Sequence, residues 1–384
     1  MVEYCDAYAK FLAKQKCTGA FVAKAREIDQ GIRIEAGPAS FAMRALNWDW
    51  VEPYTHDFAA FGLAALSLTN GWHITLDTPV SLSLRRQIDG LSKVYRLWSL
   101  PRLSALRLDM PDVVDPPAHE GRLGRIVCLS GGIDSVFAAI TAKTRQDLAA
   151  GLIISGADYP CSRSPGFAER RRRVSAIADI LGVPLYVVET DIRKAGYDWE
   201  MVHAFNLACC LHFCSGSYAS GGYAYDWALH QEVFRNVVSN QSGLNRFFST
   251  DGFALHGYGR RHNRIEKLAA IAAHDPALTR HISVCWENNE GGGNCGHCKK
   301  CVETRLAFHA LGIPDEDTFD TREPLVDLIG RLTIGQGYTS VVNSMLRITE
   351  LVDAMPKGPI RAALCDFEQT LRQHVFERHP LRGY

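Results

Sequence analysis

The chain has 384 residues, 47% of them hydrophobic and 22% charged, which is typical of a globular protein large enough for two or three domains. Its 42 basic side chains balance its 42 acidic ones, so the broad positive field of a nucleic-acid-binding enzyme is not expected. No stretch approaches the ~20 apolar residues of a membrane span, and the N-terminal MVEYCDAYAKFLAKQ has no apolar signal core, so we expect a cytoplasmic protein without a membrane partner.

Residues 1–120 contain strand-like and helix-like segments but no recognisable chemical motif. Apolar–polar alternation predicts strands within Phe21–Ala36 and Trp72–Leu84. Helical spacing predicts three helices, at Tyr4–Lys16, Asp57–Leu68 and Leu84–Leu97. We predict an N-terminal α+β accessory domain over residues 1–120, which ends in the proline-rich linker Pro111–Glu120.

A strand, a glycine turn and a helix follow one another over Gly124–Ile140. The apolar run Ile126–Leu129 predicts a buried strand, and SGGIDS at Ser130–Ser135 leads into a helix. Adjacent glycines before a helix N-terminus let free backbone N–H groups surround a phosphate. Asp134 would cap the helix or hold Mg²⁺. The residues expected to bind phosphate are Ser130, Gly131, Gly132, Asp134 and Ser135; the alternative is an ordinary strand-to-helix turn.

Strands and helices alternate from residue 121 onward. The predicted strands are Ile126–Leu129, Gly151–Ser155 and Pro184–Glu189, and the predicted helices are Ser135–Leu148, Phe167–Leu181 and Met201–Phe213. This order predicts a parallel sheet with helices on both faces, whose ligands bind beyond the carboxyl ends of the strands. Ser217–Asp226, rich in glycine and aromatic residues, is predicted to be a flexible substrate loop. Polar candidates for substrate contacts are Asp158, Tyr159, Tyr225 and Asp226.

Two groups of cations accompany this pattern. Arg170–Arg173 lie on a predicted helix, where successive side chains point about 100° apart, so the four arginines cannot share one face. A solvated helix surface is therefore the favoured interpretation, and a phosphate contact is the alternative. Arg264 and Lys267 share one face of the predicted helix Arg264–Ala273. They would serve catalysis by neutralising a triphosphate or a leaving pyrophosphate, or they would pair with Glu266 at the surface.

Four of the twelve cysteines form the pattern C-x9-C-x2-C-x2-C, at Cys285, Cys295, Cys298 and Cys301. Four thiolates suit a tetrahedral structural zinc ion. Two alternatives remain. Iron–sulfur clusters also use closely spaced cysteines, and the four residues could be scattered reduced thiols. In a cytosolic chain this number of cysteines indicates metal or thiol chemistry rather than disulfides.

The last part of the chain is predicted to be helical and without catalytic residues. After the predicted helix Glu303–Leu311, the segments Glu323–Leu332, Thr339–Met355 and Ile360–Phe376 have helical spacing, and Asp320 or Thr321 would cap the first. We therefore divide the chain into residues 1–120, a catalytic domain at 121–312, and a helical C-terminal segment at 313–384.

The SGGIDS loop resembles the pyrophosphate loop (PP-loop) of the N-type ATP pyrophosphatases, which share an adenine nucleotide alpha hydrolase-like fold. Together with the later four cysteines and the Arg264-x-x-Lys267 helix, it resembles the 7-cyano-7-deazaguanine synthase (QueC) family over residues ~121–312. The chain departs from the family at Asp158-Tyr159-Pro160 and in its two long flanks. Long QueC-like proteins also occur in antiphage operons, and this chain resembles that group.

The resemblance implies an AMP-forming ligase that makes a C–N bond. ATP and Mg²⁺ would activate 7-carboxy-7-deazaguanine as an acyl-adenylate, ammonia or a protein amine would accept the acyl group, and Zn²⁺ would be structural. The expected partners are this small carboxylate, optionally an acceptor protein, and optionally a second copy of the chain; nucleic acid is not expected. The alternatives are a tRNA-thiolating enzyme with an iron–sulfur cluster and a nucleotide sensor without turnover.

Overall fold

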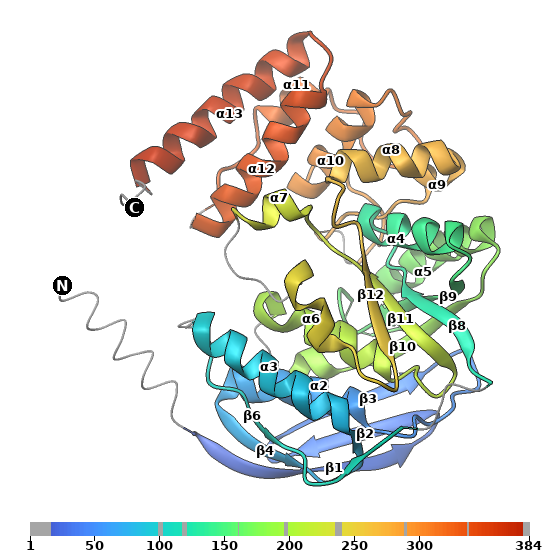
Figure 1. Ribbon diagram of the computed structural model, residues 1–384. Coiled ribbons are helices and arrows are strands. Elements are labelled where there is room, and N and C mark those ends of the chain that lie inside the picture. Colours follow the sequence, from blue (N-terminus) through green and yellow to red (C-terminus); the bar gives the residue numbers. More distant parts are fainter. Residues whose placement is uncertain are drawn as a thin grey trace.

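The computed structural model describes residues 17–98, 103–116, 121–159, 161–195, 199–234, 240–287, 290–335 and 338–378. Within these residues the chain forms a ten-stranded sheet with the order β12-β11-β8-β9-β10-β3-β2-β1-β4-β6 (Figure 1). Its strands are β1 (Gly19–Ile28), β2 (Gly31–Ala36), β3 (Ala39–Ala45), β4 (Trp72–Leu76), β6 (Arg107–Asp109), β8 (Leu123–Cys128), β9 (Leu148–Ser155), β10 (Leu185–Thr190), β11 (Tyr218–Ala224) and β12 (Ala254–Tyr258). The helix predicted at Tyr4–Lys16 lies outside the described residues.

The half of the sheet formed by β8 to β12 is parallel, as the sequence predicted. Its strands alternate with α4 (Ile133–Thr144), α5 (Pro165–Leu181) and α6 (Trp199–His212). Neighbouring strand residues face opposite cores: Leu152 belongs to the core that includes α6, whereas Ile153 belongs to the core that includes α4 and α5. The predicted α/β class with both sheet faces covered is confirmed for this half.

The other half of the sheet was not predicted, because residues 1–120 were expected to form an α+β domain beside the parallel sheet rather than further strands of it. Strands β1, β2 and β3 pair antiparallel, and β3 joins β10 antiparallel at Val188↔Ala45, so the whole sheet is mixed. Helices α2 (Asp57–Asn70) and α3 (Leu82–Trp98) share one apolar core with α6. The Trp50 ring stacks on Phe213 at 4.7 Å between centroids. Residues 17–116 therefore continue the sheet of the parallel half, and their accessory role stays a prediction.

The prediction of a flexible substrate loop at Ser217–Asp226 is wrong. Most of this segment is β11, an interior strand between β8 and β12, and Tyr218 and Tyr223 are buried. A side chain at Gly221 would come within 2.6 Å of Leu255, so glycine here allows close packing of neighbouring side chains rather than mobility.

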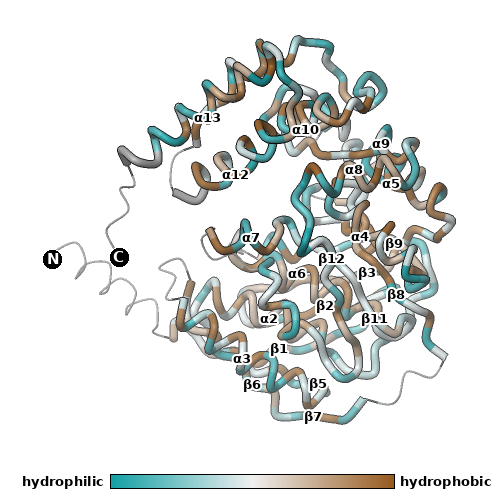
Figure 2. The backbone as a smooth tube through the Cα atoms, turned by 45° about the horizontal axis from the view of Figure 1, so that its top comes forward, coloured by the Kyte–Doolittle hydropathy of each residue, from teal (hydrophilic) through white to brown (hydrophobic). Residues whose placement is uncertain are grey.

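The C-terminal segment is helical, as predicted. Helix α12 (Tyr338–Ala354) packs on α10 (Lys299–Ala310), and α13 (Pro359–Arg378) packs on α12. In Figure 2 the tube of α13 alternates between hydrophobic and hydrophilic stretches, and Leu364 and Leu371 are fully buried. Pro324, not Asp320 or Thr321, precedes the first helix, α11 (Leu325–Ile329), because that helix begins later than predicted.

The remaining elements are short or lie between these layers. They are α7 (Leu229–Glu232), α8 (Arg264–His274), α9 (Ala277–Arg280), the 3₁₀ helices Ile192–Ala195 and Ser242–Phe248, and the pair β5 (Val80–Ser81) and β7 (Val113–Val114). In the part of the chain that is described, no helix combines the length and apolar character needed to cross a bilayer.

Candidate active site and metal cluster

The Ser130–Ser135 loop connects β8 to the N-terminus of α4. The Ser135 hydroxyl accepts a hydrogen bond from the Ser130 N–H (3.2 Å) and donates one to the Gly132 carbonyl (2.9 Å), which closes the turn. The N-cap of α4 is Gly132, so the predicted cap at Asp134 is wrong: Asp134 lies inside the first turn. A carboxylate there still interacts favourably with the helix dipole.

The two glycines of the loop have different environments. Gly131 has φ +83°, and a methyl group on it would lie 2.9 Å from Val174 Cγ2. Its carbonyl accepts the Ser283 N–H at 2.8 Å, which ties the loop to the segment before the cysteine cluster. Gly132 has φ −73°, and a methyl group on it would come no closer than 3.7 Å to any neighbouring atom. Backbone strain therefore requires glycine at position 131 but not at position 132.

Asp134 is paired with the helix that carries the second predicted cation pair. The fully buried Lys267 ammonium donates to Asp134 Oδ1 (2.7 Å) and to the Tyr225 carbonyl (2.6 Å), and Arg264 Nη2 lies 4.0 Å from Asp134 Oδ2. Burial alone would raise the pKa of Asp134, but the charges of Lys267 and Arg264 outweigh it and lower that pKa. The Glu266 side chain instead accepts the Asn263 N–H in a capping box at the start of α8. The alternative in which Glu266 pairs with Arg264 and Lys267 at the surface is therefore wrong.

A cavity of about 780 Å³ opens beyond the carboxyl ends of β8, β9 and β11. This is the edge of the sheet where ligands of parallel α/β folds bind, and the volume is in the range of ligand sites. Four of the five predicted phosphate-binding residues line it, together with Arg264; Gly131 turns toward Ser283 instead. Helices α6, α10 and α12 contribute further lining residues: His203, Lys300 and Asn343.

The polar substrate candidates divide into two groups. Asp158 and Asp226 line the cavity, and Asp226 Oδ2 lies 3.9 Å from His203 Nε2. Tyr159 is buried, and its hydroxyl accepts a hydrogen bond from Arg170. Tyr225 reaches the site through its backbone carbonyl, which holds Lys267.

Arg170 is a buried connector, which corrects the prediction of a solvated arginine surface. Its Nη1 donates to the Ser130 and Ser283 carbonyls, both at 3.1 Å, and its Nη2 donates to the Cys285 carbonyl at 3.1 Å. One guanidinium thus joins the phosphate loop to the first cysteine of the cluster. Its neighbours in the run differ: Arg173 is also buried, whereas Arg171 and Arg172 are exposed.

Replacing Arg170 with lysine should lower the melting temperature, and it should weaken about tenfold the ATP binding that the SGGIDS resemblance implies. An ammonium cannot reach all of these acceptors, and each buried acceptor left unpaired costs about 1–3 kcal/mol. Arg171→Lys, in the same arginine run but exposed, is the matched control and should behave like the unmodified protein. Calorimetric titration with a non-hydrolysable ATP analogue and a thermal melt measure both effects; equal behaviour of the two variants would contradict the connector role.

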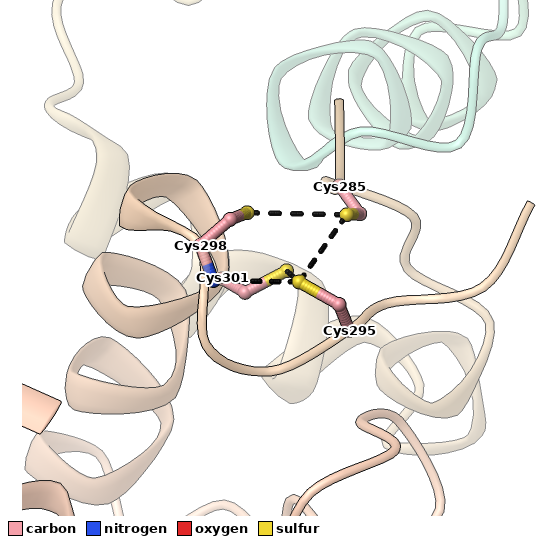
Figure 3. A group of neighbouring side chains, drawn as sticks. All are labelled: Cys285, Cys295, Cys298 and Cys301. Carbon is pink, nitrogen blue, oxygen red and sulfur yellow. Dashed lines mark hydrogen bonds between the residues drawn. The ribbon is translucent and has the colours of Figure 1, made fainter. Parts of the chain in front are cut away.

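The four cysteines converge, with their side chains pointing toward one another at the start of α10 (Figure 3). Sulfur–sulfur distances are 3.5 Å for Cys285–Cys295 and 3.9 Å for both Cys285–Cys298 and Cys295–Cys301. Buried Asn294 fixes the approach, because its Oδ1 accepts the N–H groups of Val284 and Cys285. A tetrahedral zinc ion with sulfurs at about 2.3 Å needs sulfurs roughly 3.8 Å apart, so this cluster could hold a metal such as zinc.

The thiols of the cluster hold their protons tightly when no cation is bound. Hydrogen bonding with Cys285 raises the pKa of Cys298 to about 12, and hydrogen bonding with Cys285 raises the pKa of Cys301 as well. Such thiols keep their protons unless a cation stabilises the thiolates, so metal binding must release protons.

Lys300 is a cavity residue that sequence reasoning missed. It directly precedes a cysteine ligand candidate, Cys301, and its ammonium lies 4.6 Å from the centroid of the Trp286 ring. Removal from water and the charge of Arg264 lower the pKa of Lys300. The opposing charges of Asp158 and Asp226 offset this shift only in part. The sequence signal that could have identified Lys300 was its position beside the metal-ligand candidate Cys301, just before a predicted helix.

Comparison with known proteins found one similarity of note. The chain resembles a protein named 7-cyano-7-deazaguanine synthase from Rhizobium meliloti (strain 1021), with 26% identity over 230 residues that cover 51% of this chain and 91% of that protein. No model of a protein family matches the chain, and no solved structure matches it. Nearly the whole of that relative thus corresponds to about half of this chain.

Proposed function

We propose that this chain is an ATP-dependent enzyme of the QueC type, an AMP-forming ligase that activates a 7-carboxy-7-deazaguanine-type carboxylate and transfers the acyl group to an amine. The observation that carries the proposal is the shared cavity: residues of the SGGIDS loop, Arg264 and Cys285 of the cysteine cluster all border it, and buried Lys267 holds the loop residue Asp134 from behind. The similarity to a 7-cyano-7-deazaguanine synthase supports the same substrate class.

The loop would bind the part of ATP that leaves. A carboxylate is a poor acyl donor because its oxygen is a poor leaving group, and adenylation supplies a better one. The carboxylate oxygen attacks the α-phosphorus, the bond from that phosphorus to the bridging oxygen breaks, and pyrophosphate departs into the backbone N–H groups that begin α4. Gly132 leaves the space for this close approach.

Arg264 would stabilise charge that develops at the α-phosphate. Its Nε is buried without a hydrogen-bond partner among the described residues, and its guanidinium lies 4.0 Å from Asp134, so donors remain available to a ligand. Lys267 is fully buried and donates to Asp134 and Tyr225, and it would act by holding the first turn of α4 in place. Catalysis by positioning and preorganised charge needs no further group here.

Two metals belong to the proposal. Zinc at Cys285, Cys295, Cys298 and Cys301 would be structural, fixing the cavity wall at Cys285 and Lys300. Magnesium would arrive with the triphosphate, for which Asp134 is the loop carboxylate.

The acceptor would be ammonia or a protein amine. The amine attacks the acyl carbon, AMP leaves, and an amide forms; with ammonia a second activation of the amide would give the nitrile. A protein acceptor would fit a role in antiphage defence, and the half of the chain that the similarity to the relative does not cover would offer it docking surface. Cytoplasmic location belongs to the same proposal.

Product analysis tests the reaction. The purified chain is mixed with ATP, Mg²⁺ and 7-carboxy-7-deazaguanine, first alone, then with ammonia, then with candidate acceptor proteins. AMP and pyrophosphate formed only when the acid is present would support the proposal, and a deazaguanine-sized mass added to one protein would identify the acceptor. Turnover of ATP to ADP, or no dependence on the acid, would contradict it.

A further inference from the structure

Two of the four arginine and lysine side chains that line the cavity are committed to backbone carbonyls. Arg170 donates to three carbonyls, and Arg193 donates to the Ala157 carbonyl and covers the Trp199 ring. Two others are different: Arg264 keeps an unpartnered Nε, and the Lys300 ammonium has no acceptor among the described residues, only the ring of Trp286. The carboxylates of Asp134, Asp158 and Asp226 line the same cavity and partly offset these charges, while the Lys300 ammonium and the Arg264 Nε keep hydrogen-bond donors available to an anionic ligand.

The two uncommitted cations have different neighbours. Arg264 lies beside Asp134 at the phosphate loop. Lys300 projects from the first turn of α10, and the Trp286 ring that it covers lines the same cavity and is 53% exposed. An exposed indole in a ligand cavity offers apolar surface on which a planar ring can stack, and the ammonium over the same indole adds a charge.

We infer that Trp286 and Lys300 form the binding subsite for the acyl substrate, an aromatic ring system with a carboxylate: the ring stacks on Trp286 and the carboxylate pairs with Lys300. This rests on the proposed function and names the residues that select its substrate. Arg264 on the α-phosphate and Lys300 on the carboxylate neutralise the two anions that must meet for adenylation, which would otherwise repel each other.

The charge and the ring can be tested separately by comparing two ligands. The acid 7-carboxy-7-deazaguanine and its neutral amide differ only at the group that Lys300 would hold. Dissociation constants are measured for both by calorimetry in the presence of a non-hydrolysable ATP analogue. Lys300→Met should weaken binding of the acid about 10- to 100-fold and leave the amide within about twofold. Trp286→Ala should weaken both ligands about tenfold, because stacking does not depend on the charge.

Lys299→Met is the matched control. Lys299 precedes Lys300 on the same helix turn, but its ammonium donates to the Ser344 hydroxyl. It should keep the preference of the unmodified protein for the acid.

Three results would overturn the inference. Equal losses of acid and amide in Lys300→Met would mean that Lys300 is structural. A weaker affinity for the ATP analogue with the acid unaffected would assign Lys300 to the triphosphate. Both of these leave the proposed function standing, whereas no binding of the acid by the unmodified protein would overturn the function and the subsite together.

Discussion

Replacing Gly132 with alanine should reduce AMP formation by about 100-fold or more while leaving the melting temperature unchanged. The backbone at Gly132 suits alanine, and its methyl group would meet no atom of the protein closer than 3.7 Å. In the proposed complex the pyrophosphate would occupy that space, so the methyl group would displace it from the N–H donors that stabilise its charge. Pyrophosphate release and a thermal melt on the same sample measure both parts.

Two further alanine variants frame this result. Gly131→Ala should lose both activity and stability, because position 131 has a positive φ and contacts Val174. Gly243→Ala makes the same chemical change where no atom lies within 4 Å, away from the loop, and should change neither. Full turnover by Gly132→Ala would show that no phosphate approaches this loop.

Replacing Cys298 with serine should release the metal and lower the melting temperature by on the order of 10 °C. The chain should carry one zinc ion, measured by elemental analysis, because four sulfurs lie within 4.8 Å of one another. Metal binding to such a cluster contributes directly to folding. Activity should fall too, since Cys285 and Lys300 form part of the cavity wall.

The exposed Cys365 on α13 provides the control, and Cys365→Ser should keep the metal and the melting temperature. A chelator should reproduce the Cys298→Ser effect on the unmodified chain, less strongly at high pH than at low pH, because thiolates bind the metal after losing protons. Iron with visible absorbance after anaerobic purification would contradict the zinc assignment and favour a sulfur-transfer enzyme.

The parts of the site that could be predicted are those coded by neighbouring residues. SGGIDS places its glycines and hydroxyls within six positions, and the cysteine spacing brings three ligand candidates into one turn. The pairing of Lys267 with Asp134 was not predicted. The sequence predicted only that each residue lies near a bound phosphate. Each of these signals depends on local geometry, which sequence reports well.

The parts that could not be predicted depend on contacts between distant segments. Arg170 looked like a surface residue because its acceptors, Ser130 and Cys285, lie 40 and 115 residues away. The joining of β3 to β10 has the same character: no local pattern in either strand specifies it. Ser217–Asp226 lacks regular alternation, since its glycines pack against neighbouring side chains.

The C-terminal segment shows the same limit, and it changes how the acceptor is tested. Asn343 of α12 lines the cavity, and Arg347 donates to the Asp226 carbonyl beside it. Removing the residues after 312 would also delete Ile348 and Leu351 and expose the core side chains that share their cluster, such as Leu306. Loss of activity in such a truncated chain would therefore not show where an acceptor protein docks, and substitutions at exposed positions are the better test.

Adenylation itself is tested most directly with a carboxylate labelled in both oxygens with ¹⁸O. If the acid attacks the α-phosphorus, one of its oxygens stays with the phosphorus when the acyl group moves to the amine. We expect AMP that carries one ¹⁸O, detected by mass spectrometry, together with unlabelled pyrophosphate. AMP without label, or ADP and phosphate as products, would contradict the acyl-adenylate.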